Sequence, residues 1–286
     1  MRTKLIATAV AGTALAASVA TGVGLSGANA GTGTQAAQAT TTSCKRTVDP
    51  MRVVSLNVKS NPKMSAAKVR ADVDKAAKLG ADVIMWQEIQ PDYYKNIVRA
   101  ENSTGGNGQW KHYQTGYAIP ISIRVGGDSP WVVRDTGVKK MHSGMATVSP
   151  HRYVTWVKAY NKQSRQTTIF MNTHMVSGAW NGRYNKADEW RKKMWNIHFA
   201  KQSELIKDFS NRGYTVVYGG DFNRQEMAKF TARDSRITLH GIDKIGVVRT
   251  ANDRIEKVTV RKTVGGFNSD HDAKRVSVRV SGCAAS

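Results

Sequence analysis

Acidic residues are scarce in this chain of 286 residues. Aspartate and glutamate together number 21 against 43 lysines and arginines, which gives a formal charge of +22. Such a charge attracts polyanions and speeds their encounter with the protein. Nucleic acid fits this field best; the other options are an anionic membrane or cell-wall polymer, and a charge that only keeps an exported protein soluble. The basic residues are spread along the chain, which argues against a basic tail on a neutral enzyme.

Cysteine is also rare, because the chain contains only Cys44 and Cys283. So few thiols argue against a structural zinc site. An even number of cysteines in an exported chain favours a disulfide, and two free thiols are the alternative. The bridge would close nearly the whole folded region into one loop and contribute at most about 5 kcal/mol by chain entropy.

Long apolar runs are lacking after residue 30, so no later segment is expected to cross a membrane. Arg2 and Lys4 precede an apolar run that is followed by Ala28-Asn29-Ala30, a small-residue cleavage site. This order is typical of a secretory signal peptide. A membrane anchor is the alternative, but the run is short and interrupted by threonine, serine and glycine. We expect cleavage near Ala30, a secreted product of charge +20, and no stable membrane insertion.

Internal repeats and interdomain linkers are lacking as well. Residues 31–43 are rich in Gly, Thr, Ala and Gln without apolar periodicity, which predicts a disordered leader. The residues that remain after the signal peptide are numerous enough for one large domain or two small ones. We therefore expect a signal peptide over 1–30, a leader over 31–43 and a single folded domain over 44–286, present as a monomer.

Hydrophobic periodicity predicts many strands with a few helices between them. Strands are expected at about 52–58, 81–86, 112–125, 131–134, 144–149, 153–160, 167–172, 214–218, 242–248, 256–261 and 274–280. Helices are expected from about Ser65 to Gly80, from Pro91, and from about Asn185 to Asn211. The apolar stripes are Val69, Val73, Ala76 and Ala77 in the first helix, and Trp190, Met194, Ile197, Leu205 and Phe209 in the last. This order favours one α+β domain with two packed sheets and helices outside.

Several expected strands end alike, with apolar residues giving way to Asn, Asp, Glu or His. These ends are Asn57, Gln87-Glu88, Asn172-Thr173-His174, Gly219-Gly220-Asp221-Phe222-Asn223 and Asp243, with Ser269-Asp270-His271 preceding the last strand. A single polar residue at a strand end is usually only solvated. Together, however, these ends supply carboxylates, amides and two histidines that a sheet can bring to one rim, where ligands commonly bind.

The residue types at these ends constrain the chemistry. Oxygens of Asp, Glu and Asn suit a hard cation such as Mg²⁺, Mn²⁺ or Ca²⁺. A hard ion beside two imidazoles is suited to phosphate-ester hydrolysis, because the ion neutralises the phosphate and an imidazole paired with a carboxylate takes a proton from water. A serine hydrolase is disfavoured, since the chain has no nucleophile elbow of the G-x-S-x-G type.

The order of these motifs resembles that of the endonuclease/exonuclease/phosphatase superfamily, which has the deoxyribonuclease I-like fold. The motifs that carry the resemblance are Asn57, Gln87-Glu88, Asn172-Thr173-His174, Gly220-Asp221-Phe222-Asn223 and Ser269-Asp270-His271. They span nearly the whole mature chain, about 51–281, and indicate a secreted bacterial-type member. The resemblance implies a four-layered α/β sandwich, in which two mainly antiparallel sheets pack face to face with helices outside. Residues 44–286 would then be a single catalytic domain.

The resemblance also implies a metal centre. Glu88 would be a principal ligand of a divalent cation, Mg²⁺ first and Mn²⁺ or Ca²⁺ as options, with Asn57 and Asp270 close to the ion. Asp221 and Asn223 would orient or activate the water and bind the scissile phosphate.

Histidines would supply the proton steps. By resemblance, Asp243 would orient His271, which would act as the general base or polarise the phosphate. His174 would donate to the phosphate or the leaving group, and which of these two imidazoles is the base stays open. His142 stands where relatives often carry a site tyrosine, and it either donates to phosphate or is a surface histidine.

Some positions depart from the family pattern or stand near the site. Lys59 replaces an acidic residue of several relatives, so it either weakens a second metal position or contacts phosphate. The glutamate that pairs with the first histidine in some relatives has no clear counterpart. Arg152 and Arg183 either contact phosphate or are solvated. Trp180 either stacks on a base or sugar, or packs on its own loop.

The leading hypothesis is a secreted, metal-dependent phosphodiesterase that cleaves DNA non-specifically, with RNA as a further substrate. The charge favours it, but a fold does not choose its substrate. A secreted sphingomyelinase or phospholipase C-type enzyme is the alternative, and would need an exposed apolar hairpin, weakly matched by Ala118 to Ile123 with Trp131. A catalytically silent binding module is a third hypothesis, which the complete set of metal and histidine candidates disfavours.

Overall fold

The computed structural model describes residues 46–59, 64–90, 108–144, 151–180, 188–238 and 240–283. The chain divides after Thr42, and residues 43–286 form one compact unit. The expected signal peptide and leader, Cys44, Arg183, the helix from Pro91 and most of the strand at 144–149 lie outside the described residues.

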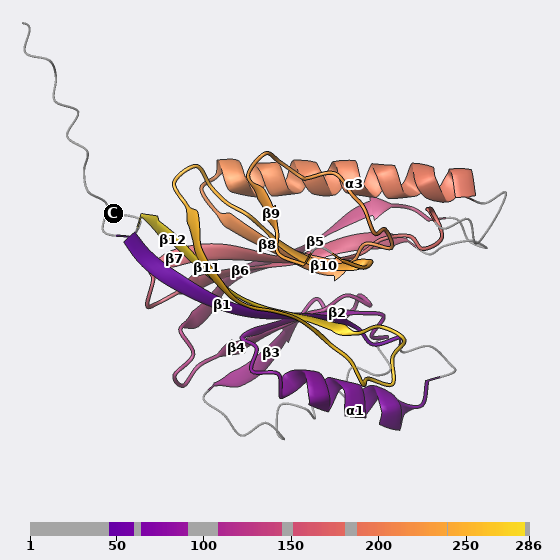
Figure 1. The fold of residues 1–286 in the computed structure, drawn as a ribbon, viewed down its shortest axis with the longest axis horizontal. Coiled ribbons are helices and arrows are strands. Elements are labelled where there is room, and N and C mark those ends of the chain that lie inside the picture. Colours follow the sequence, from indigo (N-terminus) through magenta and orange to yellow (C-terminus); the bar gives the residue numbers. More distant parts are fainter. Residues whose placement is uncertain are drawn as a thin grey trace, which may run out of the picture. The chain divides into compact units, whose positions relative to one another are not determined.

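Two six-stranded sheets make up the described unit (Figure 1). The first has the order β11-β12-β1-β2-β4-β3. Its strands are β1 (Arg46–Asn57), β2 (Val83–Gln87), β3 (Gln109–Tyr113), β4 (Ile121–Val125), β11 (Arg254–Val264) and β12 (Ala273–Cys283). The second has the order β5-β6-β7-β8-β10-β9. Its strands are β5 (Trp131–His142), β6 (Arg152–Asn161), β7 (Gln166–His174), β8 (Thr215–Asp221), β9 (Asp234–Arg236) and β10 (Asp243–Val248).

Each sheet has a parallel pair at its centre, β1 with β2 and β7 with β8. The other neighbouring strands of the described sheets are antiparallel. Each parallel pair is joined through a helix, as a parallel connection requires. Helix α1 (Ala66–Ala77) follows β1, and helix α3 (Asp188–Asn211) follows β7.

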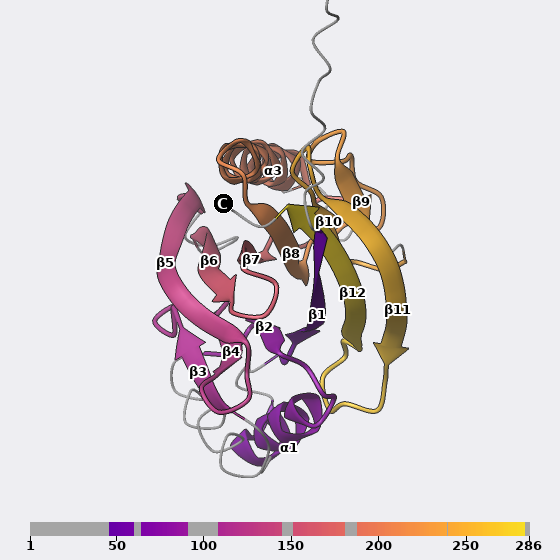
Figure 2. The same ribbon diagram turned by 90° about the vertical axis from the view of Figure 1, so that its left-hand side faces the viewer.

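The helices lie on the outer faces of the two sheets (Figures 1 and 2). Helix α1 covers the first sheet and α3 covers the second, so the layers run helix, sheet, sheet, helix. The predicted four-layered α/β sandwich with two mainly antiparallel sheets is therefore confirmed. None of the described helices is long and apolar enough to cross a membrane.

Side-chain alternation along the central strands decides which residues meet between the sheets. Val53 of β1 and Val217 of β8 belong to one core between the sheets, whereas Leu56 belongs to the core beneath α1. Successive residues of a strand point to opposite faces. The same alternation turns Asn57 and Asp221, at the ends of β1 and β8, into the space between the sheets, where both side chains are buried.

The first predicted helix is confirmed in its extent and its stripe. All four residues expected to face inward on α1 are buried: Val69, Val73, Ala76 and Ala77. The Ser65 hydroxyl accepts a hydrogen bond from the backbone N–H of Lys68 and caps the helix. Gly80 follows with a φ of +70°, a conformation that suits glycine beyond a helix end.

The last predicted helix is confirmed, but its buried face is rotated by about one residue from the expected stripe. The fully buried positions on α3 include Trp195, His198, Gln202 and Ile206. Of the expected stripe only Phe209 is fully buried, and the rest is partly exposed. Polar residues, among them His198 and Gln202, lie on the buried face, so a pattern of apolar residues alone predicts a stripe beside it.

Two strand predictions differ markedly from the structure, and one strand was not predicted. Residues 112–125 do not form one strand, because Gln114 has a φ of +61° and the chain turns through 114–120 between β3 and β4. Strand β5 continues eight residues beyond Arg134, to His142. The short strand β9 has a polar sequence, Asp-Ser-Arg, that gives no strand signal.

Candidate active site

Four strand ends lie together between the two sheets. Asn57 pairs in register with Gln87 at the ends of β1 and β2, and His174 pairs with Asp221 at the ends of β7 and β8. Because parallel strands end at the same edge, each central pair presents its polar residues together. Gly220 permits the close approach of β7 and β8: a Cβ on this glycine would lie 2.0 Å from the Thr173 carbonyl oxygen, and its φ is +142°.

The Asn57 carboxamide joins two acidic residues. Its Nδ2 donates to Glu88 Oε1 at 2.9 Å and to Asp221 Oδ2 at 3.1 Å. Its Oδ1 accepts from the backbone N–H of Lys59 at 2.9 Å. The strand end therefore holds two carboxylates toward one point.

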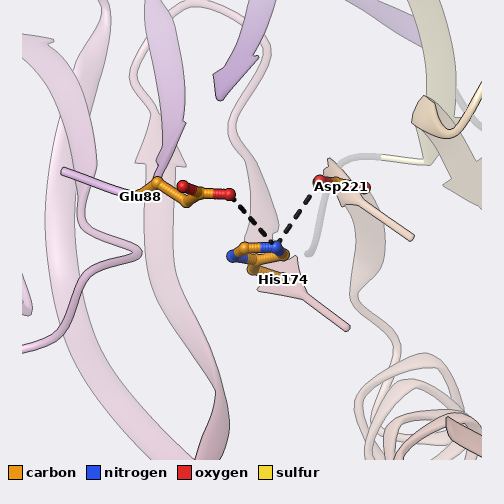
Figure 3. A group of neighbouring side chains, drawn as sticks. All are labelled: Glu88, His174 and Asp221. Atoms are coloured by element: carbon orange, nitrogen blue, oxygen red, sulfur yellow. Dashed lines mark ion pairs between the residues drawn. The ribbon is translucent and has the colours of Figure 1, made fainter. Parts of the chain in front are cut away.

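His174 lies between Glu88 and Asp221 (Figure 3). Its Nε2 is 3.7 Å from Glu88 Oε1 and 3.5 Å from Asp221 Oδ2, and its Nδ1 is 3.0 Å from Arg152 Nη1. A guanidinium only donates, so Nδ1 accepts and the ring proton resides on Nε2. Burial, followed by the charge of Arg152, holds the pKa of His174 well below its ordinary value. His174 is thus a neutral ring with an N–H directed at the carboxylates.

His271 has the opposite arrangement. Its Nδ1 is 2.8 Å from Asp243 Oδ2, and its Nε2 is 3.9 Å from Asp221 Oδ2. Burial lowers the pKa of His271, but the hydrogen bond to Asp243 and the nearby carboxylates outweigh it and raise the pKa to about 9. The neutral ring would keep its proton on Nδ1 and present a lone pair at Nε2. The His174 ring therefore offers a donor to the site, and the His271 ring offers an acceptor to the same site once it is deprotonated.

Asp221 lies between the two imidazoles and is almost fully buried. Burial, and next the charge of Asp243, raise the pKa of Asp221 to about 7. Its Oδ1 accepts from the backbone N–H of Asn223 at 2.8 Å, and Asn223 Nδ2 donates to the Met175 carbonyl at 3.0 Å. These contacts fix Asn223 at the edge of a group of side chains that we call the cluster: Glu88, His174, Asp221, Asp243 and His271.

Two overlapping groups of side chains have metal-ligand character. They are Glu88, His174 and Asp221, and Asp221, Asp243 and His271, with potential ligand atoms within 4.8 Å of one another in each group. Two carboxylates that converge on one amide repel each other unless a cation lies between them. Their oxygens are the ligands that a hard divalent ion prefers. The residues therefore fit a divalent metal site.

Asp270 occupies a different position from the other predicted ligands. Its Oδ2 forms an ion pair with Lys59 Nζ, and its side chain is 56% exposed. Its Oδ1 is 4.0 Å from His271 Nε2. The structure thus brings Glu88 and Asn57 into the cluster, adds Asp221, and places Asp270 at the edge, where Lys59 offsets its charge.

Backbone strain marks three of these positions. Lys59, Glu88 and Asn223 have φ values of +47°, +54° and +51°. Residues other than glycine rarely adopt this conformation, and it is concentrated at functional sites. In each case the unusual turn lies at or just beyond the end of a central strand, where the chain leaves the sheet.

Two buried amides hold the sheets in position beneath the cluster. Gln87 Nε2 donates to Asn172 Oδ1 at 2.7 Å, which connects β2 to β7. Asn172 Nδ2 donates to the carbonyls of Trp86 at 2.7 Å and of Ile119 at 3.1 Å. Both residues belong to motifs seen in the sequence, but their positioning role was not predicted.

Asp72 is a positioning residue that the sequence motifs miss. From α1, its carboxylate accepts from the backbone N–H groups of Asn268 at 2.7 Å and Ser269 at 2.8 Å. The Ser269 hydroxyl in turn donates to the Asn57 carbonyl at 2.6 Å. Asp72 thus fixes the turn that precedes His271. The sequence feature that could have indicated this role is the presence of an acidic residue on the inward face of a predicted helix.

The remaining predicted site residues lie around the cluster or outside it. The His142 ring packs against Trp190 and His198 beneath α3, so the structure does not bring it to the carboxylates. Trp180 is 40% exposed, and the guanidinium of Arg224 lies 3.8 Å from its ring centroid. Arg224 directly follows Asn223, but no motif in the sequence predicts its contact with Trp180.

Comparison with known proteins identifies the fold. No family model and no curated protein matches the sequence. TDP2 from C. elegans is a structural match with 14% identity and a TM-score of 0.60, over 80% of this chain and 75% of that one. An endonuclease/exonuclease/phosphatase from Bacteroides vulgatus has 14% identity and a TM-score of 0.60, over 80% and 98%. The mannosyl-6-phosphatase Bt3783 of Bacteroides thetaiotaomicron has 14% identity and a TM-score of 0.54, over 80% and 98%. The chain therefore has the endonuclease/exonuclease/phosphatase fold.

Proposed function

We propose that the chain is a secreted, metal-dependent phosphodiesterase of the endonuclease/exonuclease/phosphatase superfamily, which hydrolyses nucleic acid, mainly DNA and also RNA. One observation carries the proposal: His174 Nε2 and His271 Nε2 approach the same oxygen of Asp221, at 3.5 Å and 3.9 Å, beside Glu88. A proton donor and a proton acceptor around a carboxylate cluster fit the attack of water on a phosphodiester.

The chain's own residues divide the proton steps between them. Glu88 and Asp221 would hold the divalent ion, Mg²⁺ first, which supplies charge neutralisation at the phosphate when bound. In its deprotonated form, His271 takes a proton from the attacking water at Nε2, because Asp243 occupies its Nδ1. His174 donates its Nε2 proton toward the phosphate or the leaving oxygen, because Arg152 occupies its Nδ1.

Charge and burial favour nucleic acid over lipid as the substrate. The formal charge of +22 attracts a polyanion. The apolar segment that would serve as a membrane-docking hairpin is inside the protein: Ile119, Ile121, Ile123 and Trp131 are at most 5% exposed. A lipid phosphodiesterase needs such side chains on its surface.

The proposal includes export, a disulfide and a monomeric state. Arg46, two residues after Cys44 in the sequence, pairs in register with Cys283 on β12, and the disulfide itself rests on the even number of cysteines in an exported chain. Mass spectrometry of the secreted protein is expected to show an N-terminus near Gly31 and a mass lacking two hydrogens before reduction. Light scattering during gel filtration is expected to give the monomer mass.

Hydrolysis of four substrates tests the proposed activity. Purified mature protein is incubated at low salt with plasmid DNA, RNA, sphingomyelin vesicles or inositol phosphates, with Mg²⁺, Mn²⁺ or EDTA. DNA cleavage is expected with either metal and not with EDTA. Glu88→Gln and His271→Ala are expected to abolish it, whereas Asp208→Asn, an exposed acidic residue on α3, leaves it unchanged. Intact DNA and RNA under all conditions, or preferential release of phosphocholine, would contradict the proposal.

A further inference from the structure

A cavity of about 500 Å³ adjoins the catalytic cluster. Its lining includes Glu88 and His174 together with Tyr117, Tyr153 and His151. We propose that this cavity binds the base of the nucleotide next to the scissile phosphate, with the two tyrosines as its stacking surface. The inference rests on the proposed nuclease function and deepens it, because it specifies how one substrate nucleotide is held.

The two tyrosine rings come from a loop of the first sheet and a strand of the second. Tyr117 lies in the segment 114–120 between β3 and β4, and Tyr153 is the second residue of β6. Their ring centroids are 4.8 Å apart and their planes are tilted by 57°. Both side chains are partly exposed. A tilted pair offers a planar ligand the face of one ring and the edge of the other, the two arrangements that aromatic groups prefer.

The segment that carries Tyr117 is fixed from below. The Thr155 hydroxyl donates to the Ile119 carbonyl at 2.6 Å, and Asn172 Nδ2 donates to the same carbonyl at 3.1 Å. Tyr153 lies two residues before Thr155 on β6, so strand alternation turns both side chains toward this segment. The tyrosine pair is therefore built in place, which reduces the entropy lost on ligand binding.

The lining chemistry favours a nucleobase over other groups. Arg152 also borders the cavity and carries a permanent positive charge, which disfavours a quaternary ammonium such as choline. Ala118 and Ile119 are the aliphatic residues of the lining, too few to hold an acyl chain. Every base has an aromatic face and polar edges, so stacking between tyrosines and hydrogen bonds at the rim both become available.

The position of the cavity beside the cluster also favours a nucleobase as its ligand. Glu88 and His174 belong to both the cavity lining and the catalytic cluster. A phosphate at the cluster and a base in the cavity therefore occupy adjoining places, as the phosphate and base of one nucleotide do. The cavity would thus orient the substrate strand and would discriminate against a nucleotide that lacks its base.

The test combines a protein change with a substrate change. End-labelled single-stranded DNA carries one abasic residue at a defined position, and cleavage at each flanking phosphate is compared with intact DNA. The natural protein is expected to cut one flanking phosphate at least about tenfold more slowly. In Tyr117→Ala/Tyr153→Ala, kcat/KM for intact DNA is expected to fall about 5- to 100-fold, and the abasic and intact strands to be cut equally.

Control variants separate stacking from folding. The double phenylalanine variant keeps both rings and is expected to retain activity and discrimination. Tyr160→Ala, at the other end of β6, is expected to do the same. Melting temperatures check that each variant folds, and if the alanine variant does not, Tyr117→Leu and Tyr153→Leu are measured singly.

Each outcome decides the inference. Equal cutting of abasic and intact strands by the natural protein overturns it, as does discrimination retained in the folded alanine or leucine variants. A loss of sphingomyelin hydrolysis with unchanged DNA cleavage also overturns it, in favour of a headgroup ligand. An absence of any DNA cleavage by the natural protein is a failure of the proposed function itself, and is distinguishable because every DNA substrate would remain intact.

Discussion

At the scale of single residues, two charged neighbours decide what each imidazole can do. Arg152 faces Nδ1 of His174, and Asp243 faces Nδ1 of His271. The Arg152 guanidinium can only donate, so it leaves the His174 proton on Nε2, whereas the Asp243 contact keeps a proton on Nδ1 of His271, so that Nε2 is the nitrogen that loses its proton when that ring becomes neutral. Family resemblance leaves the choice of base open, and these two contacts support His271 in that role.

Removal of Arg152 should release the His174 ring. In Arg152→Met, both tautomers become accessible, and kcat for DNA is expected to fall about 10- to 100-fold. Nitrogen NMR of histidine-labelled protein in EDTA should show the Nε2 proton fixed in the natural protein and exchanging between tautomers in the variant. Arg212→Met, which changes an exposed arginine, is the matched control. An unchanged kcat together with a fixed Nε2 proton would show that Arg152 does not set the ring.

His271 should make metal-free stability depend on pH. Its pKa is raised from 6.5 to about 9, so its charged form stabilises the fold below about pH 6.5, and that contribution is lost as the pH rises through 9. The full effect corresponds to about 3 kcal/mol. Urea unfolding in EDTA should therefore show a larger stability difference between the natural protein and His271→Gln at pH 6 than at pH 10. Equal differences at both pH values would remove the predicted linkage.

At the scale of elements, helix α1 does more than cover a sheet. It connects β1 to β2, and through Asp72 it holds the turn before β12, 196 residues away along the chain. The apolar stripe of the helix was predictable from its period, because a helix places residues three and four apart on one face. The contact of Asp72 with the turn at Asn268 and Ser269 was not predictable, because no periodicity connects positions so far apart in the sequence.

Substitution of Asp72 should affect stability and activity together. Asp72→Asn removes the charge that accepts two backbone N–H groups and is expected to cost about 1–3 kcal/mol of unfolding free energy. DNA cleavage should also decline, because the turn positions His271. Asp74→Asn on the same helix loses only an ion pair with Arg70 and should change stability by about 0.5 kcal/mol or less. Urea unfolding compares the two, and equal effects would assign Asp72 no special role.

At the scale of the whole molecule, the positive charge is not confined to one helix, strand or terminal segment. The formal charge of +22 comes from lysines and arginines along the whole chain, whereas the catalytic cluster itself is acidic. A basic surface around an acidic centre suits a polyanion that is first attracted and then hydrolysed at a metal ion. Composition alone predicted the attraction.

Salt should distinguish this attraction from the chemical step. If two phosphates are contacted, kcat/KM for DNA is expected to fall about tenfold between 50 and 200 mM salt, and more steeply for each further contact. Hydrolysis of bis(p-nitrophenyl) phosphate, which has one charge, should change much less. A similar salt dependence for both substrates would show that long-range charge does not guide DNA to the site.

The sequence by itself determined the local features of this protein. Motifs such as Gly220-Asp221-Phe222-Asn223 at the end of a strand, and the stripe of α1, depend on neighbours a few residues apart. Through the family resemblance that these motifs carry, the sequence predicted the four layers and named most of the residues that meet in the candidate cluster. Only the tertiary structure decided that Lys59 pairs with Asp270, that Arg152 sets His174, and that two tyrosines 36 positions apart form one surface. The physical reason is that these contacts arise where separate strand ends meet between the sheets, and the order of residues along one strand does not encode which other strand end it will meet.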